Sequence, residues 1–247
     1  MKESIDELML EVKNLTKSFG YITAVKNFSF EMDKAEILGL IGPNGAGKTT
    51  LFNLLSGVIK ADSGKIIFLG RNITNMPPYK ICKLGIARTH QIPRPYGKLI
   101  VTENVMIGSL FGPGDDIKTA REKSLKVLEF VGLQNKKDMP IGMLTAFEIK
   151  MLEIARALAA EPKLLLLDEP FAGLNPAEID NCKELVKRIR ENGISVILVE
   201  HNMRAIRGTV DRVLVMHQGE KIAEGTFEEI AKEPAVIDAY LGSFPVM

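Results

Sequence analysis

Hydrophobic positions along the chain alternate between short apolar runs and longer segments with apolar residues at helical spacing. Runs of strand length occur at Ile37–Ile41, Leu164–Leu167 and Ile194–Val199. Segments with helical spacing occur at Lys48–Ser56 and Ala177–Arg190. This alternation predicts a mostly parallel α/β sheet that is covered by helices.

The first seventy residues or so have a different pattern. Leu10–Val12, Ala24–Glu31 and Lys65–Phe68 have the composition of strands, and turns rich in Gly, Asn and Asp separate them. Short strands joined by such turns are typical of hairpins. We therefore predict an antiparallel β subdomain beside the α/β core.

Strand signals disappear between about residues 95 and 160. Leu125, Leu128 and Leu133 recur at helical spacing, and a loop at Gly112–Asp116 interrupts the segment. We therefore predict a helical subdomain inserted into the core. The chain then has three parts, with the core divided between the first and the last: residues 1–94, 95–160 and 161–247.

Composition narrows the class of protein. With 46% hydrophobic residues, 26% charged residues and a net charge of +1, the chain gives no reason to expect nucleic acid as a partner. The apolar runs are far shorter than a bilayer span, and the N-terminus lacks the apolar core of a signal peptide. Two cysteines, Cys82 and Cys182, are too few for a disulfide framework and indicate a reducing compartment.

A glycine-rich segment, Gly42–Thr49, matches G-x-x-x-x-G-K-[ST] and lies between a predicted strand and a predicted helix. Its glycines allow backbone N–H groups to surround a β-phosphate, and the helix N-terminus adds partial positive charge. Lys48 would neutralise the β- and γ-phosphate oxygens, and the Thr49 hydroxyl would bind Mg²⁺. The segment therefore predicts a P-loop that binds MgATP.

Two acids, Asp168 and Glu169, follow the apolar strand Leu164–Leu167. Alone, such a pair would indicate a solvated strand end. Beside a P-loop it predicts that Asp168 holds Mg²⁺ and that Glu169 orients or deprotonates the attacking water. His201 follows Ile194–Val199 at the carboxyl edge of the predicted sheet, where it is a candidate for a hydrogen bond to the γ-phosphate.

Together these motifs resemble the ATP-binding subunit of an ABC transporter over nearly the whole chain. Gly42–Thr49 resembles its Walker A motif, Leu164–Glu169 its Walker B motif and His201 its switch histidine. The resemblance implies a P-loop NTPase core of the RecA type and ATP hydrolysis coupled to transport. It also implies that Phe19 stacks on adenine and that Gln91 contacts Mg²⁺ and water.

The resemblance thus gives each candidate residue a role. The nucleotide would contact Phe19, Asn44, Gly45, Ala46, Gly47, Lys48, Thr49 and Thr50. The catalytic residues would be Lys48, Gln91, Glu169 and His201. The Mg²⁺ ion would be held by Thr49, Gln91 and Asp168.

Three segments narrow the resemblance to the ATPases of branched-chain amino-acid importers: Ala87–Val105, Asp168–Glu178 and Val236–Gly242. Membrane-spanning permease subunits would then be partners, and the chain would lie at the cytoplasmic face of the cell membrane. ATPases for urea or amide import and for lipopolysaccharide export are alternatives within the family. Soluble ABC ATPases of DNA repair or translation fit less well, because they usually carry coiled-coil insertions or two tandem cassettes.

The chain departs from the family at the Leu-Ser-Gly-Gly-Gln signature, whose positions are occupied here by Leu144–Glu148. In the family, the signature of one subunit contacts the γ-phosphate held by a second subunit in a head-to-tail pair. Phe147 would crowd that approach, and Glu148 would add a negative charge beside an anion. The same residues also form a capping-box pattern, with Thr145 at the N-cap and Glu148 at N3.

The chain is therefore expected to contain every residue of a P-loop half-site, whereas its signature should contact the γ-phosphate held by its partner only weakly. This favours pairing with a different ATPase subunit, and a regulatory subunit with weak hydrolysis is the alternative. A second capping pattern occurs at Asn175, where many family members carry an aspartate. Pro176 at N1 and Glu178 at N3 predict that a helix begins there.

Overall fold

The computed structural model describes residues 8–200 and 206–241. Its strands are β1 Leu8–Phe19, β2 Ile22–Asp33, β3 Ile37–Ile41, β4 Ser63–Phe68, β5 Arg71–Asn72, β6 Ile86–Arg88, β7 Leu164–Asp168, β8 Ser195–Glu200, β9 Arg212–His217 and β10 Glu220–Gly225. Its helices are α1 Lys48–Leu55, α2 Pro78–Leu84, α3 Val101–Phe111, α4 Ile117–Phe130, η1 Gln134–Lys136, η2 Ile141–Met143, α5 Ala146–Leu158, α6 Pro176–Glu191, α8 Phe227–Ile230 and α9 Pro234–Leu241.

Strands β6 to β10, together with β3, form a six-stranded sheet in the order β10-β9-β3-β8-β7-β6. All its neighbouring strands are parallel except β10, which pairs antiparallel with β9. Every residue of β3, β7 and β8 is buried. Parallel strands covered on both faces have continuous apolar runs, which is why the sequence identified these strands. The predicted α/β core is confirmed.

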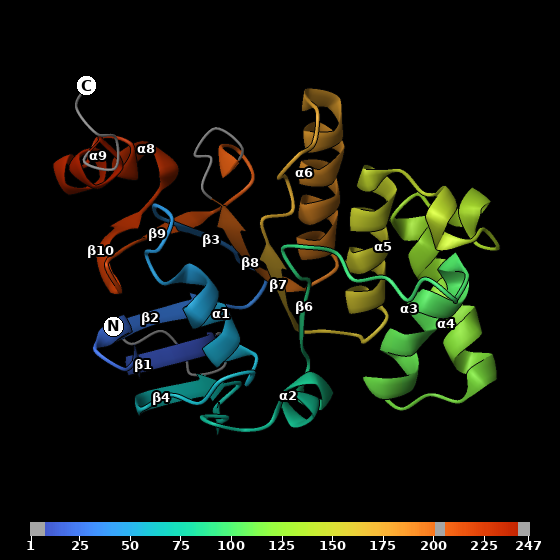
Figure 1. Ribbon diagram of the computed structural model, residues 1–247, viewed down its shortest axis with the longest axis horizontal. Helices are drawn as coiled ribbons and strands as arrows, with labels where there is room; N and C mark the ends of the chain where they lie inside the picture. Colours follow the sequence, from blue (N-terminus) through green and yellow to red (C-terminus); the bar gives the residue numbers. More distant parts are fainter. Residues whose placement is uncertain (1–7, 201–205, 242–247) are drawn as a thin grey trace.

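Strands β1, β2, β4 and β5 form the predicted antiparallel sheet, in the order β2-β1-β4-β5 (Figure 1). β1 and β2 are each 12 residues long, so the predicted ranges Leu10–Val12 and Ala24–Glu31 were too short. Large parts of both strands, such as Thr16–Phe19, are exposed or only partly buried. Because their cross-strand hydrogen bonds need no apolar side chains, hydrophobic pattern alone missed these ends.

Helix α1 lies between the antiparallel sheet and the parallel sheet. Its Leu51 and Phe52 share one buried cluster with Phe28 of β2 and Leu40 of β3. The packing leaves the N-terminal end of α1 at the carboxyl end of β3, where the glycine-rich segment joins the two elements. The fold therefore places that segment at the edge of the sheet where α/β proteins bind ligands.

Helices α3, α4 and α5 gather at one end of the molecule, far from α8 and α9 (Figure 1). α3 contacts both α4 and α5. The helical spacing at Leu125 and Leu128 is confirmed by α4, whereas Leu133 lies beyond its end. The boundaries at 94/95 and 160/161 stay a prediction. Within the described part of the chain, no helix is long and apolar enough to cross a bilayer.

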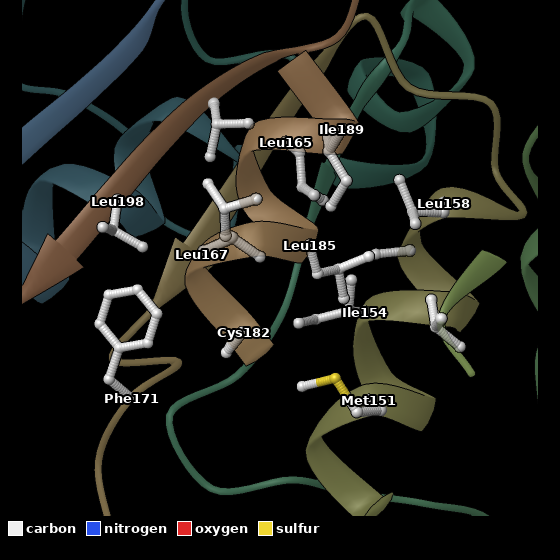
Figure 2. Packing of buried hydrophobic residues seen from close by; sticks show 14 of the residues in the cluster. Met151, Ile154, Leu158, Leu165, Leu167, Phe171, Cys182, Leu185, Ile189 and Leu198 are labelled. Atoms are coloured by element: carbon white, nitrogen blue, oxygen red, sulfur yellow. The ribbon is translucent and has the colours of Figure 1, made fainter. Parts of the chain in front are cut away.

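Helix α5 connects this helical end to the parallel sheet. Figure 2 shows Met151, Ile154 and Leu158 of α5 in one cluster with residues of β7 and α6. From the other side, Leu165 of β7 and Leu185 of α6 complete the packing. Helix α5 is therefore packed against both the helical end and the sheet side of the molecule.

Both predicted capping boxes are present. Thr145 caps α5, and Glu148 at N3 returns a hydrogen bond to its backbone. Asn175 caps α6 in the same way with Glu178, and Pro176 stands in the first turn. These local patterns use side chains within one turn of the backbone they satisfy, so the sequence alone defines them.

Candidate nucleotide site

The P-loop runs from the end of β3 to the first turn of α1, and two of its glycines are sterically required. A Cβ at Gly42 would lie 2.0 Å from the carbonyl oxygen of Met216. A Cβ at Gly47 would lie 2.1 Å from the carbonyl oxygen of Ala24, and the φ angle of Gly47 is 110°. L-residues rarely adopt that conformation. Packing against two other strands therefore fixes the loop as a narrow cradle.

Lys48 is buried, and its charge lies inside the loop. Its Nζ donates hydrogen bonds to the carbonyl oxygens of Gly42, at 2.7 Å, and Pro43, at 3.0 Å. Burial lowers the pKa of Lys48, while Glu169 and Asp168 act in the opposite direction. The ammonium is thus held by backbone oxygens next to the cradle, where phosphate oxygens would find a ready partner.

One pocket of about 310 Å³ collects most of the predicted site. It is lined by Ala24, Asn44, Gly45, Ala46, Gly47, Lys48, Thr49, Thr50, Gln91 and Glu169. Nε2 of Gln91 donates a hydrogen bond to Oε2 of Glu169 at 2.9 Å, although the two residues are 78 positions apart. The fold therefore brings the P-loop, the glutamine and the second acid of the Walker B motif to one place.

Asp168 ends β7 and is only 5% exposed. Burial raises the pKa of its carboxyl, while the Arg88 guanidinium acts in the opposite direction. Nη2 of Arg88 lies 3.5 Å from Oδ2 of Asp168. Nη1 of Arg88 donates to Oδ1 of Asn53, at 2.7 Å, and to Oγ of Ser56, at 3.1 Å. Helix α1 thus fixes the cation that neutralises the buried aspartate.

The backbone of Glu169 separates the two acids. Its φ angle of 49° is left-handed, a costly conformation for a residue with a Cβ. Its N–H donates to the carbonyl oxygen of Val199 at 3.0 Å, and its own carbonyl oxygen accepts from Nζ of Lys150 at 3.2 Å. These bonds hold the turn, so that Asp168 meets Arg88 while Glu169 enters the P-loop pocket.

Of the predicted site residues that the structure describes, Phe19 and Asp168 do not line this pocket. Phe19 ends β1 and is 52% exposed, and the residues lining the pocket do not include it. Nζ of Lys17 lies 5.4 Å from the centre of its ring. His201 lies outside the described residues. Glu200, which precedes it, is buried and accepts a hydrogen bond from the Phe171 N–H at 3.1 Å.

Two residues of the altered signature, Thr145 and Glu148, cap helix α5. Oγ1 of Thr145 accepts from the Glu148 N–H at 3.3 Å, and Oε2 of Glu148 accepts from the Thr145 N–H at 2.9 Å. Oε1 of Glu148 also lies 2.5 Å from Nζ of Lys136. Phe147 is half-buried against the core cluster that includes α5. The capping prediction is confirmed, and the weakened phosphate contact stays a prediction.

Comparison with known protein families completes this picture. Residues 25–172 match the family described as "ABC transporter", and residues 220–244 match the family described as "Branched-chain amino acid ATP-binding cassette transporter". The chain belongs to the ABC transporter ATPases. It is therefore an ATP-binding subunit of an ABC transporter, in a family whose cassettes hydrolyse ATP to drive transport. The resemblance drawn from the motifs is confirmed.

Individual relatives of this ABC ATPase are similar along almost their whole length. The "Probable branched-chain amino acid transport ATP-binding protein LivG" of Archaeoglobus fulgidus is 38% identical, with 95% of this chain and 96% of that protein covered. The "High-affinity branched-chain amino acid transport ATP-binding protein BraF" of Pseudomonas aeruginosa is 36% identical, with 95% and 98% covered.

Two solved structures have the same fold. One is a nucleotide-free ATP-binding cassette from an ABC transporter, with a TM-score of 0.87, 32% identity, and 94% of this chain and 98% of that chain covered. The other is the ADP conformation of an ATP-binding cassette, with a TM-score of 0.87, 33% identity, and 95% and 99% covered. The fold predicted from the sequence is thus the fold of nucleotide-binding cassettes.

Proposed function

We propose that this ABC ATPase hydrolyses MgATP in its P-loop pocket and powers the import of branched-chain amino acids. The hydrogen bond from Gln91 to Glu169, at the wall of the P-loop pocket, is the observation that supports hydrolysis most directly. The match over residues 220–244 and the names of the relatives support the substrate class. This match and these names favour branched-chain amino acids as the cargo over urea or amides, and import over lipopolysaccharide export.

The pocket fits a magnesium-bound triphosphate. A cradle too narrow for a Cβ at Gly47 suits phosphate oxygens, and the hydroxyl of Thr49 in the pocket lining is a hard oxygen donor. The carboxylate of Asp168, which precedes the pocket residue Glu169 at the end of β7, is a second donor of this kind. We propose that Thr49 and Asp168 hold Mg²⁺, with Gln91 beside them. When bound, Mg²⁺ neutralises charge that develops on the phosphoryl oxygens.

The remaining roles belong to side chains of this chain. Lys48 neutralises phosphate oxygens from inside the cradle, and Glu169 orients the attacking water and accepts its proton. Gln91 holds the Glu169 carboxylate in place. Phe19, exposed at the end of β1, is proposed to offer its ring to the adenine. His201, which follows Glu200 in the sequence, is proposed to contact the γ-phosphate.

Replacing the proposed base tests this arrangement. Glu169→Gln keeps the size of the side chain but cannot accept a proton, so turnover should fall at least about a hundredfold while ATP binding is retained. Glu184→Gln, an exposed acid on α6, is the matched control and should leave both unchanged. Undiminished turnover in Glu169→Gln would remove Glu169 from the mechanism.

Membrane-spanning permeases are the proposed partners, with this chain at the cytoplasmic face of the membrane. A groove of about 370 Å³ between the helical end and the sheet offers them a surface. Its lining combines apolar residues, such as Ile107 and Phe111, with the cations Arg88 and Arg156. The complete transporter can be purified through a tag on this chain and placed in vesicles. Whether those vesicles take up leucine, urea or an amide would identify the cargo.

A second, different ATPase subunit is proposed to complete the motor head to tail. Glu148 would place a negative charge beside a γ-phosphate held by the partner, and Phe147 would crowd its approach, so this chain offers little to that phosphate. The partner's signature would instead complete the P-loop site of this chain. Fast ATP hydrolysis by the purified chain alone, unaffected by glycine at Ala146 and Phe147, would rule out this asymmetric pair.

The altered signature also favours a second candidate function, a regulatory subunit that binds ATP and hydrolyses it slowly. Steady-state turnover of Glu169→Gln within the complete transporter separates the two. If this chain is a regulatory subunit, the transporter with Glu169→Gln should keep most of its turnover. If it is the proposed motor subunit, the transporter should lose most of its turnover.

A further inference from the structure

The segment between β6 and α3 carries Gln91 and follows α5 closely. Gln91 reaches Glu169 through its side chain, while the backbone on either side of it turns toward α5. The contact runs through the backbone amides of His90 and Arg94, which flank the glutamine in sequence. The loop 90–94 therefore joins the parallel sheet to the helical end at one short segment.

Both of these amides donate to one side chain, Glu153 of α5. Oε2 of Glu153 accepts from the His90 N–H at 3.2 Å, and Oε1 accepts from the Arg94 N–H at 2.9 Å. Nη2 of Arg156, one turn further along α5, donates to Oε1 at 2.7 Å. A single carboxylate thus holds the loop before and after Gln91.

The burial of Glu153 calls for a physical reason. Its side chain is 3% exposed, and burying a carboxylate is unfavourable unless hydrogen bonds and an opposite charge replace water. On the core side of α5, Met151, Ile154 and Leu158 belong to a cluster of buried apolar side chains (Figure 2). An apolar residue at 153 would avoid the desolvation cost but could not hold the loop, so the acid serves the loop rather than the packing.

Arg156 strengthens the same attachment. Its Nη1 donates to the carbonyl oxygen of Arg94 at 3.0 Å, and its guanidinium lies 5.5 Å from the centre of the Tyr96 ring. Hydrogen bonds to ionised groups are shorter and stronger than those between neutral groups. The loop is therefore bound more firmly to α5 than neutral turn contacts would bind it.

We propose that Glu153 is a positioning residue that fixes the loop 90–94 to α5, so that the orientation of α5 sets the approach of Gln91 to Glu169. When α5 moves with the helical end, the amides of His90 and Arg94 move with it, and Gln91 between them must follow. This effect on hydrolysis rests on the role proposed above for Glu169. The attachment of the loop does not depend on that role.

Glu153→Gln in the full-length chain tests the proposal. The change keeps the shape but replaces one acceptor oxygen with an amide NH₂, which faces an N–H donor. Amide hydrogen exchange over residues 90–94 should become roughly tenfold faster or more, because an opening limited by these bonds becomes easier. The kcat for MgATP should fall about tenfold through misplacement of Gln91, with KM changed less than about twofold.

A matched control separates this effect from general loosening of the helical end. Ser109→Ala removes the hydrogen bond from a buried serine of α3 to Asp115, at 2.6 Å, and leaves the loop untouched. Exchange over residues 90–94 and kcat should stay as in the wild type. Glu153→Asp keeps the charge, but its side chain is one methylene too short to reach both amides, so amide exchange over residues 90–94 should again become faster. This variant replaces Glu153→Gln in the test if Glu153→Gln does not fold.

Each outcome decides one part of the proposal. Unchanged exchange over residues 90–94 in both Glu153 variants would overturn the attachment itself. Faster exchange with unchanged kcat would overturn the positioning role and leave Glu153 a structural residue. If the proposed role of Glu169 in hydrolysis is wrong, Glu169→Gln would retain turnover. Amide exchange over residues 90–94 in Glu153→Gln would still become faster, so the two failures can be told apart.

Discussion

Arg88→Met removes the positive partner of a buried carboxylate, and the loss of stability can be worked out from the structure. The side chains of Arg88 and Asp168 are 14% and 4% exposed, and their closest atoms lie 3.5 Å apart. Removing one partner of a buried pair costs about 3–5 kcal/mol, because the other charge stays desolvated and unpaired. Asp168 can relieve part of this cost by taking up a proton, so we expect a loss of about 3 kcal/mol.

The chain offers a control pair at the same separation. Nη1 of Arg190 also lies 3.5 Å from a carboxylate oxygen, that of Asp211, but these side chains are 37% and 43% exposed. Exposed pairs contribute about 0–1 kcal/mol, because water and salt screen them. Arg190→Met should therefore cost at least about 2 kcal/mol less than Arg88→Met, although the distances are equal.

Urea unfolding at neutral pH, followed by circular dichroism, measures both losses. The midpoint of Arg88→Met should fall clearly while the slope of the transition stays that of the wild type, since the surface exposed on unfolding is unchanged. Equal losses for the two variants, within about 0.5 kcal/mol, would refute the argument that burial decides the strength of these pairs.

Other contacts lead to predictions of smaller scope. The hydrogen bond from Lys136 lowers the pKa of Glu148 in the folded protein, so the cap stabilises the fold fully at pH values above the ordinary carboxyl pKa of 4.5. This contribution is lost as the pH falls through the lowered pKa of the folded state. The unfolding free energies of wild type and Glu148→Ala should therefore differ by about 1 kcal/mol at pH 7 and converge at that low pH. Gly47→Ala should abolish ATP binding in a titration, because its Cβ meets a carbonyl oxygen, whereas Gly45→Ala, with open space around it, should weaken it less. At pH 8, iodoacetamide should modify Cys82 before Cys182, because burial raises the pKa of Cys182 to about 12; equal rates would contradict this.

Hydrophobic pattern predicted β3, β7 and β8, whose residues are all buried, but it missed the parallel strands β6 and β9. β3 has the bounds that the sequence indicated, and β7 is longer by one residue, Asp168. It failed at the half-exposed parts of β1 and β2, where backbone pairing across the sheet extends the strands beyond the apolar residues. Strand ends of this kind depend on the partner strand, which the local sequence does not contain.

Some residues of the site lay beyond sequence reasoning for the same reason. Arg88 and Glu153 are ordinary charged residues in their local context, and their importance comes from partners far along the chain. A buried charge in an otherwise apolar stretch of α5, at Glu153, was the one available signal. It does not identify the amides that the charge holds.

The sequence by itself determined the P-loop, the two capping boxes and the parallel strands β3, β7 and β8, because each depends on neighbours within a few residues or on burial of a continuous run. Only the tertiary structure decided that Gln91 meets Glu169 beside Lys48, that Arg88 neutralises Asp168, and that Glu153 fixes the loop 90–94. Those contacts form where three strand ends and α5 converge. Their distances follow from the packing of whole elements, which no local pattern encodes.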